Sequence, residues 1–266
     1  MAIRINTAEE IELIRQSGTV LSQTLALVAR ELKAGKTGLE IDKLAEEFIR
    51  DNGGVPSFKG YDGFPNTLCI SVNDDVVHGL PKKEVFKEGD LVSMDCGVYM
   101  NGFHSDMAYT FGLGAIKPEH EKLLIVTKQS LYLGIEQATT GKRTGDIGFA
   151  VQEFCEEKNT FKCVRELVGH GVGKTIHEDP QVPNYGKRGQ GTRLPENCVI
   201  AIEPMVNLGK RDVYTKRDHW TIATQDGKPS AHFEHTVAVK TGKADILTTF
   251  EWIELAVKAN DQLVKV

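Results

Sequence analysis

The sequence predicts an α+β fold made of two similar halves, because an internal repeat and antiparallel strand signals occur in both. The segment 35–38 (GKTG) and the apolar helix after it recur about 106 residues later, starting at Gly141. Farther along, residues 88–95 (EGDLVSMD) resemble residues 196–203 (ENCVIAIE). Each copy contains an acidic turn, an apolar strand and a final carboxylate. The predicted pseudo-repeat spans about 35–111 and about 141–240.

The repeat has two readings. One is a chance resemblance between two amphipathic segments. The other is a true duplication, in which the halves pack face to face. A sheet formed across their junction would place Asp95 opposite Glu203, and Asp106 opposite Glu234. Four carboxylates would then converge on one point, where their mutual repulsion requires compensating cations.

Capping and turn signals predict the individual elements. Thr7 and Thr37 each precede a Glu by three residues, which is the capping-box spacing at the start of a helix. Asn101-Gly102 separates two apolar runs and predicts a tight β-hairpin. The predicted helices span about 8–34, 38–52, 118–139, 146–158 and 249–258, and the predicted strands about 68–72, 91–99, 103–111, 163–168, 199–203, 220–224 and 233–239.

Composition and charge exclude several classes of protein. The net charge is −5 and basic residues cluster only in pairs or near-pairs, so nucleic-acid binding is not expected. The five cysteines are odd in number and lack Cys-x-x-Cys spacing, which favours a reducing, cytoplasmic compartment over a disulfide framework. Residues 1–7 lack the apolar segment of a signal peptide, and no apolar run is long enough to span a membrane. Because no interface signal is visible, a monomer is expected.

Asp95 and Asp106 form the first candidate pair of ligands. The turn at Asn101-Gly102 lies roughly midway between them, so we expect them to pair across the hairpin with both carboxylates on one face. Two apposed carboxylates in an apolar sheet are costly unless something compensates their charge. The alternative is that both face solvent on an edge hairpin.

Histidines beside glycines provide candidate neutral ligands and hydrogen-bond donors. Glycine flanks His170 on both sides in the segment 169–173 (GHGVG), where the missing side chains let backbone come close to a ligand. His177 follows seven residues later, and His78 precedes a glycine in a similar setting in the first half. The alternative is a set of turns that carry incidental histidines.

The remaining histidines are expected to have lesser roles. His104 shares a strand face with Asp106 and could contact the metal ligands without binding a metal itself. His235 alternates to the face opposite Glu234. The histidines expected at the surface are His120, His219 and His232.

The charges of the candidate ligands match two divalent cations. The four carboxylates carry −4 in total, two divalent ions carry +4, and one imidazole adds a neutral nitrogen ligand. The candidate ligands are Asp95, Asp106, His170, Glu203 and Glu234. Such a set suits Co, Mn, Fe, Zn or Ni in a pair about 3.5–4 Å apart, and the lack of thiolates argues against structural zinc. A bound metal lowers the pKa of water from 15.7 to about 7, so a water activated by two metals is a strong nucleophile.

Together these motifs resemble the bacterial methionine aminopeptidases, which have the pita-bread fold. The ordered motifs are Asp95, Asp106, 169–173 (GHGVG), 177–178 (HE), 202–204 (IEP) and 234–236 (EHT), with 70–79 (ISVNDDVVHG) similar to a family segment that carries a substrate-contacting histidine. The likeness extends from the first helix to about Val239. It implies two pseudo-symmetric halves in a single catalytic domain over residues 1–266. It also implies a curved antiparallel sheet covered by helices on its outer face.

The resemblance implies a metal-dependent hydrolase, a methionyl aminopeptidase. Such an enzyme removes the N-terminal (initiator) methionine from nascent proteins when the second residue is small. A water activated by two metals would attack the first peptide bond, and the free amine of the substrate would bind one metal. The implied setting is the cytoplasm, where the partner is the N-terminal peptide of a nascent polypeptide and a transient contact with the ribosome is reasonable.

The same resemblance implies a role for each site residue. Asp106 and Glu234 would bridge both metals, Asp95 would hold one ion, and His170 and Glu203 would hold the other. Glu203 would also shuttle the proton of the attacking water. His177 would donate to the scissile carbonyl oxygen, as an oxyanion donor. His78 would lie near the scissile nitrogen, where it positions the peptide or assists its departure.

An apolar methionine pocket with a sulfur-tolerant wall is also implied. Its residues would be Tyr61, Phe64, Cys69, Ile176 and Trp220, with Phe58 at the rim. Ile176 stands where an aromatic residue is common in the family, and Phe58 stands where a smaller one occurs. These departures leave the fine substrate preference open. For Phe64, Cys69 and Ile176 the alternative is ordinary core packing.

Two other functions stay open at this point. A proline-directed dipeptidase or aminopeptidase would share the fold, and hydrolysis of Met-Ala-Ser against Xaa-Pro peptides separates the two activities. A catalytically inactive member of the fold would act as a scaffold. Such proteins typically lose metal ligands, whereas all five ligand positions here hold competent residue types.

Overall fold

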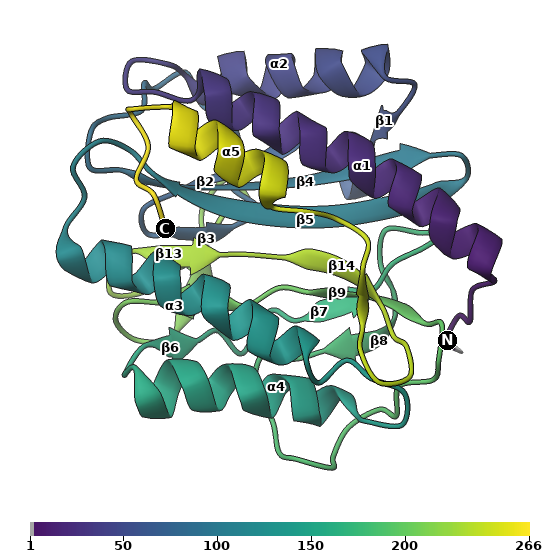
Figure 1. Cartoon of the computed structure of the whole chain (residues 1–266). Coiled ribbons are helices and arrows are strands. Elements are labelled where there is room, and N and C mark those ends of the chain that lie inside the picture. Colours follow the sequence, from purple (N-terminus) through teal and green to yellow (C-terminus); the bar gives the residue numbers. More distant parts are fainter. Residues whose placement is uncertain (1–2) are drawn as a thin grey trace.

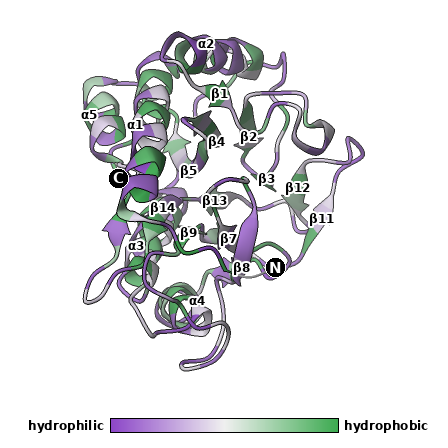
Figure 2. Cartoon of the chain, turned by 90° about the vertical axis from the view of Figure 1, so that its right-hand side faces the viewer, coloured by the Kyte–Doolittle hydropathy of each residue, from purple (hydrophilic) through white to green (hydrophobic). Residues whose placement is uncertain are grey.

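Two helix-covered layers of antiparallel strands lie one above the other in the computed structural model, which describes residues 3–266 (Figure 1). The helices are α1 (Ala8–Glu31), α2 (Gly38–Asp51), α3 (Pro118–Ile135), α4 (Thr144–Gln152) and α5 (Glu251–Ala259). Figure 2 shows α1, α3 and α5 on one side of the strands. The expected α+β class, with helices on the outer face of antiparallel sheets, is confirmed. Residues 1–2, part of the segment considered for a signal peptide, lie outside the described residues.

All strand ladders are antiparallel within the described chain. The strands are β1 (Val55–Pro56), β2 (Leu68–Val72), β3 (Asp75–Val77), β4 (Leu91–Met100), β5 (Phe103–Gly112), β6 (Lys162–Cys163), β7 (Gly169–Gly171), β8 (Glu178–Val182), β9 (Val199–Ile202), β10 (Met205–Asn207), β11 (Val213–Thr215), β12 (Ile222–Thr224), β13 (Ser230–His232), β14 (His235–Ala238) and β15 (Asp245–Ile246). The first half centres on the β4–β5 hairpin, with β1 and β2 also paired to β4. The second half contains a sheet of order β15-β14-β9-β7-β8.

Local capping chemistry starts the first two helices as the sequence predicted. The hydroxyls of Thr7 and Thr37 accept from the backbone N–H groups of Glu10 and Glu40, and each Glu carboxylate accepts in return from the N–H of its Thr. The two copies of the repeat also begin alike. Gly35 and Gly141 both have a φ of 88°, a left-handed conformation that costs glycine nothing.

Some element boundaries differ from the predicted ones. The first helix ends at Glu31 because Leu32 is already extended. The strand predicted at 220–224 begins only at Ile222, since the carboxylate of Asp218 accepts from the backbone N–H groups of Trp220 and Thr221. The helix predicted at 146–158 divides into α4 and a π-helical segment, Glu153–Lys158.

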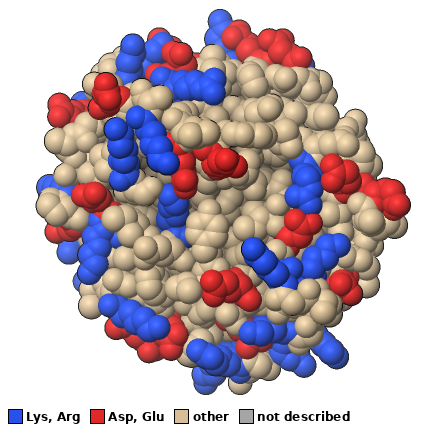
Figure 3. Space-filling view, in the orientation of Figure 1, with Lys and Arg blue, Asp and Glu red and all other residues tan. Residues whose placement is uncertain are grey.

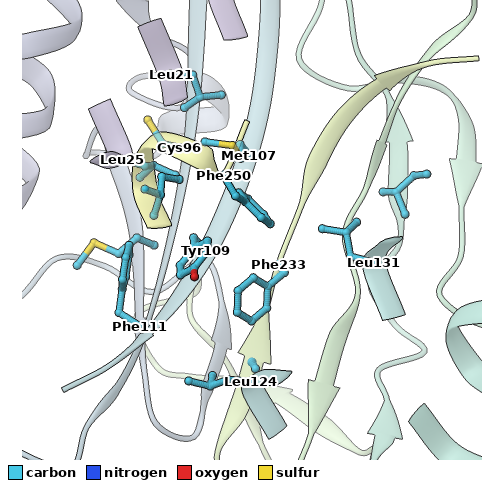
Figure 4. Close-up of a cluster of buried hydrophobic side chains, with 14 of the residues drawn as sticks. Leu21, Leu25, Cys96, Met107, Tyr109, Phe111, Leu124, Leu131, Phe233 and Phe250 are labelled. Atoms are coloured by element: carbon cyan, nitrogen blue, oxygen red, sulfur yellow. The ribbon is translucent and has the colours of Figure 1, made fainter. Parts of the chain in front are cut away.

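One apolar cluster joins the two halves. Tyr109 of β5 lies at its centre, with the ring of Phe233 at 4.9 Å and the ring of Phe250 at 5.0 Å between centroids. Both contacts are edge-on, which is a favourable arrangement for aromatic pairs. Figure 4 shows these rings between Leu21 and Leu25 on one side and leucines of α3 on the other. The buried cluster therefore holds β5 against the strands of the second half.

The outer surface is polar and mixed in charge. Figure 3 shows Lys and Arg side chains interspersed with Asp and Glu over one face of the molecule, with neither sign forming a continuous patch. Among residues 3–266, none of the helices combines the length and the apolar character that crossing a bilayer requires.

Candidate metal centre

The β4–β5 hairpin positions the first two candidate ligands. Asp95 lies opposite Ala108, and Asp106 lies opposite Gly97, so the two aspartates are diagonal neighbours. The expectation that they pair directly is wrong by two residues, because the turn closes at Met100 and Phe103 and not midway between them. An offset of two preserves the face, so both carboxylates still point the same way. Both side chains are buried, which excludes the solvent-facing alternative.

Hydrogen bonds across the junction bring Glu234 beside these aspartates. The N–H of Asp106 donates to the Thr236 hydroxyl (2.9 Å), and that hydroxyl donates to the carbonyl of Asp106 (2.7 Å). The N–H of Glu234 donates to the carbonyl of Ala108 at 3.0 Å. The segment around Glu234 is therefore fixed on β5.

His170 and Glu203 complete the set from the second half. The Nε2 atom of His170 lies 3.5 Å from Glu203 Oε1 and 3.8 Å from Asp106 Oδ2. The Nδ1 atom of His170 donates to the carbonyl of Gly171 (2.9 Å), because a carbonyl oxygen can only accept. That bond fixes the tautomer in which Nε2 keeps its lone pair for a metal.

The glycines beside His170 have a packing role. A Cβ on Gly169 would lie 2.4 Å from the carbonyl oxygen of Ala201, and a Cβ on Gly171 would lie 2.2 Å from that of Asp179. Larger residues would collide with the backbone of β8 and β9. Gly169 also lines the cavity described below, so the expectation that backbone here comes close to a ligand stays a prediction beside this packing role.

His232 is a candidate metal ligand that was not predicted from the sequence. It was expected at the surface, but it is only 1% exposed. Its Nε2 atom lies 3.7 Å from Glu203 Oε2 and 3.7 Å from Glu234 Oε2. The signal was the spacing of two residues between His232 and Glu234, which places both on one face of an extended chain.

The other histidines lie away from the carboxylates. His235 faces away from Glu234, as expected, and its ring pairs with the Thr248 hydroxyl at 2.8 Å. His104 bonds to Ser57 at 2.9 Å and does not line the cavity, so it does not support the ligands. His219 is exposed, as expected. His120 is buried, contrary to expectation, because it lies on the inner side of α3.

Burial and mutual repulsion disfavour the charged state of the four carboxylates. Burial raises the pKa of Asp95 to about 7. Burial and then the neighbouring Glu234 raise the pKa of Asp106 well above its ordinary value. The pKa of Glu203 is raised by burial and Asp106, and the pKa of Glu234 by burial and Glu203. Within residues 3–266, no Lys or Arg forms an ion pair with any of the four.

These residues fit divalent cations. Asp95 Oδ1, Asp106 Oδ1 and Glu234 Oε1 are buried without a hydrogen-bond partner, which is costly unless another group satisfies them. Two overlapping groups have ligand atoms within 4.8 Å of one another: Asp106, His170 and Glu234, and Glu203, His232 and Glu234. Burial also lowers the pKa of His170 to about 3, so its imidazole is neutral and able to bind a metal. The donor set matches the oxygen and nitrogen ligands that such ions take.

A cavity of about 510 Å³ opens onto the carboxylates. Its lining includes the candidate ligands, His78 and His177, and the predicted pocket residues Phe58, Tyr61, Phe64, Cys69 and Trp220. The rings of Phe64 and Trp220 meet edge-on at 5.2 Å. Ile176 does not reach the cavity surface: it is buried in the apolar cluster behind Phe64 and Cys69.

The two candidate catalytic histidines come from different halves of the chain but line the same cavity. His177 packs its ring edge-on against His170, with centroids 4.4 Å apart, and its Nδ1 lies 3.0 Å from the hydroxyl of Tyr61. His78 follows β3 with a φ of 56°, a strained conformation for a residue with a side chain. Such strain is typical of functional positions.

Comparison with known proteins decides the family. Residues 12–241 match Metallopeptidase family M24. The chain belongs to this family. It is 50% identical to the methionine aminopeptidase of Clostridium perfringens (strain 13 / Type A), over 92% of this chain and 98% of that one. It is 46% identical to methionine aminopeptidase 1 of Bacillus subtilis (strain 168), over 91% of this chain and 97% of that one.

Solved structures of similar proteins agree with this assignment. The crystal structure of methionine aminopeptidase from Thermotoga maritima matches with a TM-score of 0.91 and 42% identity, over 93% of this chain and 100% of that one. Prolidase from Pyrococcus furiosus matches with a TM-score of 0.75 at 24% identity, which shows the shared fold alone. The predicted resemblance to bacterial methionine aminopeptidases and the pita-bread fold are confirmed, and this M24 chain is a metallopeptidase, a hydrolase.

Proposed function

We propose that this M24 metallopeptidase removes the N-terminal methionine from nascent polypeptides whose second residue is small, using two divalent cations. The observation that carries the proposal is the apolar wall of Phe64, Cys69 and Trp220 in the same cavity as the buried carboxylates. An unbranched, polarizable methionine side chain suits a wall of aromatic rings and a thiol. The names of the relatives support the same substrate.

Five residues would hold the two cations: Asp95, Asp106, His170, Glu203 and Glu234. Of these, Asp106 and Glu234 would serve both ions. When bound, the two cations supply an activated water for attack on the first peptide bond. The free amine of the substrate, in its unprotonated form with a lone pair, would bind one of the cations. This requirement for a free N-terminus explains why only the first residue is removed.

The protein's own residues supply proton transfer and oxyanion stabilisation. Glu203 accepts the proton of the attacking water and delivers it to the leaving amine. His177 donates from Nε2 to the scissile carbonyl oxygen. This role requires a proton on Nε2, and the Tyr61 hydroxyl favours that tautomer when it donates to Nδ1. His78 positions the peptide near the scissile nitrogen.

The proposed cellular setting is the cytoplasm, where the chain acts as a monomer on the N-terminal peptides of nascent chains and contacts the ribosome transiently. All five cysteines are free and buried, as in a protein that keeps its thiols reduced. No other partner is needed for the chemistry, because every group invoked belongs to one chain.

Hydrolysis of short peptides by the metal-loaded chain tests the proposal. Met-Ala-Ser should be cleaved after methionine, and Ala-Pro-Ser should not be cleaved at a comparable rate. Activity should disappear with a chelator and return with added Mn, Co or Fe. Preference for Ala-Pro-Ser would favour a proline-directed peptidase, and no cleavage of either peptide in the metal-loaded chain would favour a scaffold.

A further inference from the structure

His232 is a buried imidazole beside the carboxylates that the proposed mechanism leaves unused. We propose that His232 is a metal ligand, and that with Glu203 and Glu234 it forms a cation site that gives this chain a second imidazole donor in addition to His170. The inference rests on the metal binding that the proposed function requires, and it extends the ligand set beyond the five residues assigned above.

Distances around His232 fit ligands of one ion better than a hydrogen bond. Its Nε2 lies 3.7 Å from Glu203 Oε2 and 3.7 Å from Glu234 Oε2. A nitrogen donor and a carboxylate oxygen in a hydrogen bond lie about 2.7–3.2 Å apart. Two donors that each lie about 2.1 Å from one tetrahedral ion are about 3.4 Å apart. The space between the three side chains is therefore close to the space that a divalent ion occupies.

Neither ring nitrogen of His232 has a partner within the described protein. Both Nδ1 and Nε2 are buried and make no hydrogen bond, and Glu234 Oε1 is likewise buried without a hydrogen-bond partner. Leaving such atoms unsatisfied costs about 1–3 kcal/mol each. An ion bound at Nε2 would remove that cost for this nitrogen, with Glu203 Oε2 and Glu234 Oε2 facing the same ion.

The backbone holds His232 in place before any ion binds. Its N–H donates to the Thr110 hydroxyl at 2.8 Å, and its carbonyl accepts from the same hydroxyl at 2.7 Å. On its other side, β13 pairs with β10, where His232 lies opposite Met205. A ligand held by two neighbouring strands loses little freedom on binding, which raises metal affinity.

Glu203 connects the two imidazoles. Its Oε1 lies 3.5 Å from His170 Nε2, and its Oε2 lies 3.7 Å from His232 Nε2. The carboxylate therefore has one imidazole facing each oxygen. An added nitrogen donor favours Co, Ni or Zn over Mn, because imidazole suits the later metals and carboxylate suits the earlier ones.

X-ray absorption at the zinc edge, measured on the full chain loaded with two equivalents of zinc, tests the ligand set directly. Two imidazoles per chain are expected in the wild type, and one in His232→Gln, which keeps a polar side chain of similar reach. His104→Gln is the matched control: it removes a half-buried histidine outside the cavity and should leave two imidazoles. One imidazole in the wild type would overturn the proposal, and that measurement does not depend on whether a variant folds.

Zinc affinity provides the second measurement. Titration of the metal-free proteins should show zinc binding at least about 10- to 100-fold weaker in His232→Gln than in the wild type, because loss of a ligand costs at least as much as loss of a residue that only orients one, with a smaller change for manganese. If the folded His232→Gln variant binds zinc and manganese as tightly as the wild type does, the proposal is contradicted. Cleavage of Met-Ala-Ser by the wild type is measured separately. An active enzyme with one imidazole ligand refutes only the ligand role of His232. An inactive enzyme with two imidazole ligands refutes only the proposed function.

Discussion

The hydroxyl of Thr236 bonds to both backbone groups of Asp106, accepting from its N–H at 2.9 Å and donating to its carbonyl at 2.7 Å. The two residues come from opposite halves of the chain, 130 positions apart. This pair of bonds fixes the strand that carries Asp106 against the strand that follows Glu234. The geometry of the metal centre therefore depends on a residue that is not itself a ligand.

Replacing Thr236 with valine should loosen this junction. Valine has nearly the same shape but leaves a buried N–H and a buried carbonyl of Asp106 without partners, at a cost of about 1–3 kcal/mol each. Urea unfolding of the metal-free protein should show this loss in Thr236→Val and only a small change in Thr236→Ser, which keeps the hydroxyl. Equal stability of the wild type and the valine variant would refute the role of this hydroxyl.

Removing a shared ligand should remove metal. Asp106→Ala leaves the other carboxylates without the oxygen that both proposed ions use, so metal analysis after dialysis should find at least one ion fewer than in the wild type, with activity lost. Glu84→Ala, which changes an exposed carboxylate, should retain the full metal content. A full complement of metal in Asp106→Ala would contradict the shared-ligand assignment.

The metal-free protein should become more stable when one carboxylate is neutralised. Burial raises the pKa of Asp95 from 3.8 to about 7, so the folded state holds more protons than the unfolded state between these values. The destabilisation caused by Asp95 therefore grows as pH rises from about 4 to about 7. In a chelator, urea unfolding should show Asp95→Asn more stable than the wild type, by a margin larger at pH 7.5 than at pH 5.

Adding metal should reverse that order, because the Asp95 carboxylate then has a cation as its partner. If the stability advantage of Asp95→Asn is the same at both pH values, or persists in the presence of metal, the view that cations offset the cost of burying the Asp95 carboxylate is contradicted.

Removing the oxyanion donor should slow turnover without removing metal. His177→Ala should lower kcat by about 100- to 1000-fold, as for loss of one such donor, and leave metal content unchanged. Tyr61→Phe removes only the hydroxyl that lies 3.0 Å from His177 Nδ1, so a smaller decrease in kcat is expected. Stopped assays with Met-Ala-Ser measure both. Full activity of His177→Ala would exclude the assigned role.

Much of this site could be predicted from local patterns. The capping boxes at Thr7 and Thr37 and the hairpin turn at Asn101-Gly102 depend on neighbouring residues, so the sequence specifies them directly. Exact register could not be predicted in the same way. The diagonal placement of Asp95 and Asp106 depends on which residues close the hairpin, and a shift of two preserves the hydrophobic pattern.

Long-range packing explains the errors. His232 was expected at the surface, but its backbone bonds to Thr110, from the other half of the chain, and its side chain is buried. Ile176 was expected in the methionine pocket, with core packing as the alternative; it lies in the buried cluster with Phe64 and Cys69 and does not line the cavity. Both positions are decided by contacts between segments far apart in sequence, which periodicity cannot reveal.

A crystal structure of the metal-loaded chain, with anomalous scattering recorded at the metal absorption edge, tests the central claim most directly. Two anomalous peaks are expected about 3.5–4 Å apart, in contact with Asp95, Asp106, His170, Glu203 and Glu234. Peaks located elsewhere, or no peak among these side chains in a fully loaded crystal, would contradict this claim.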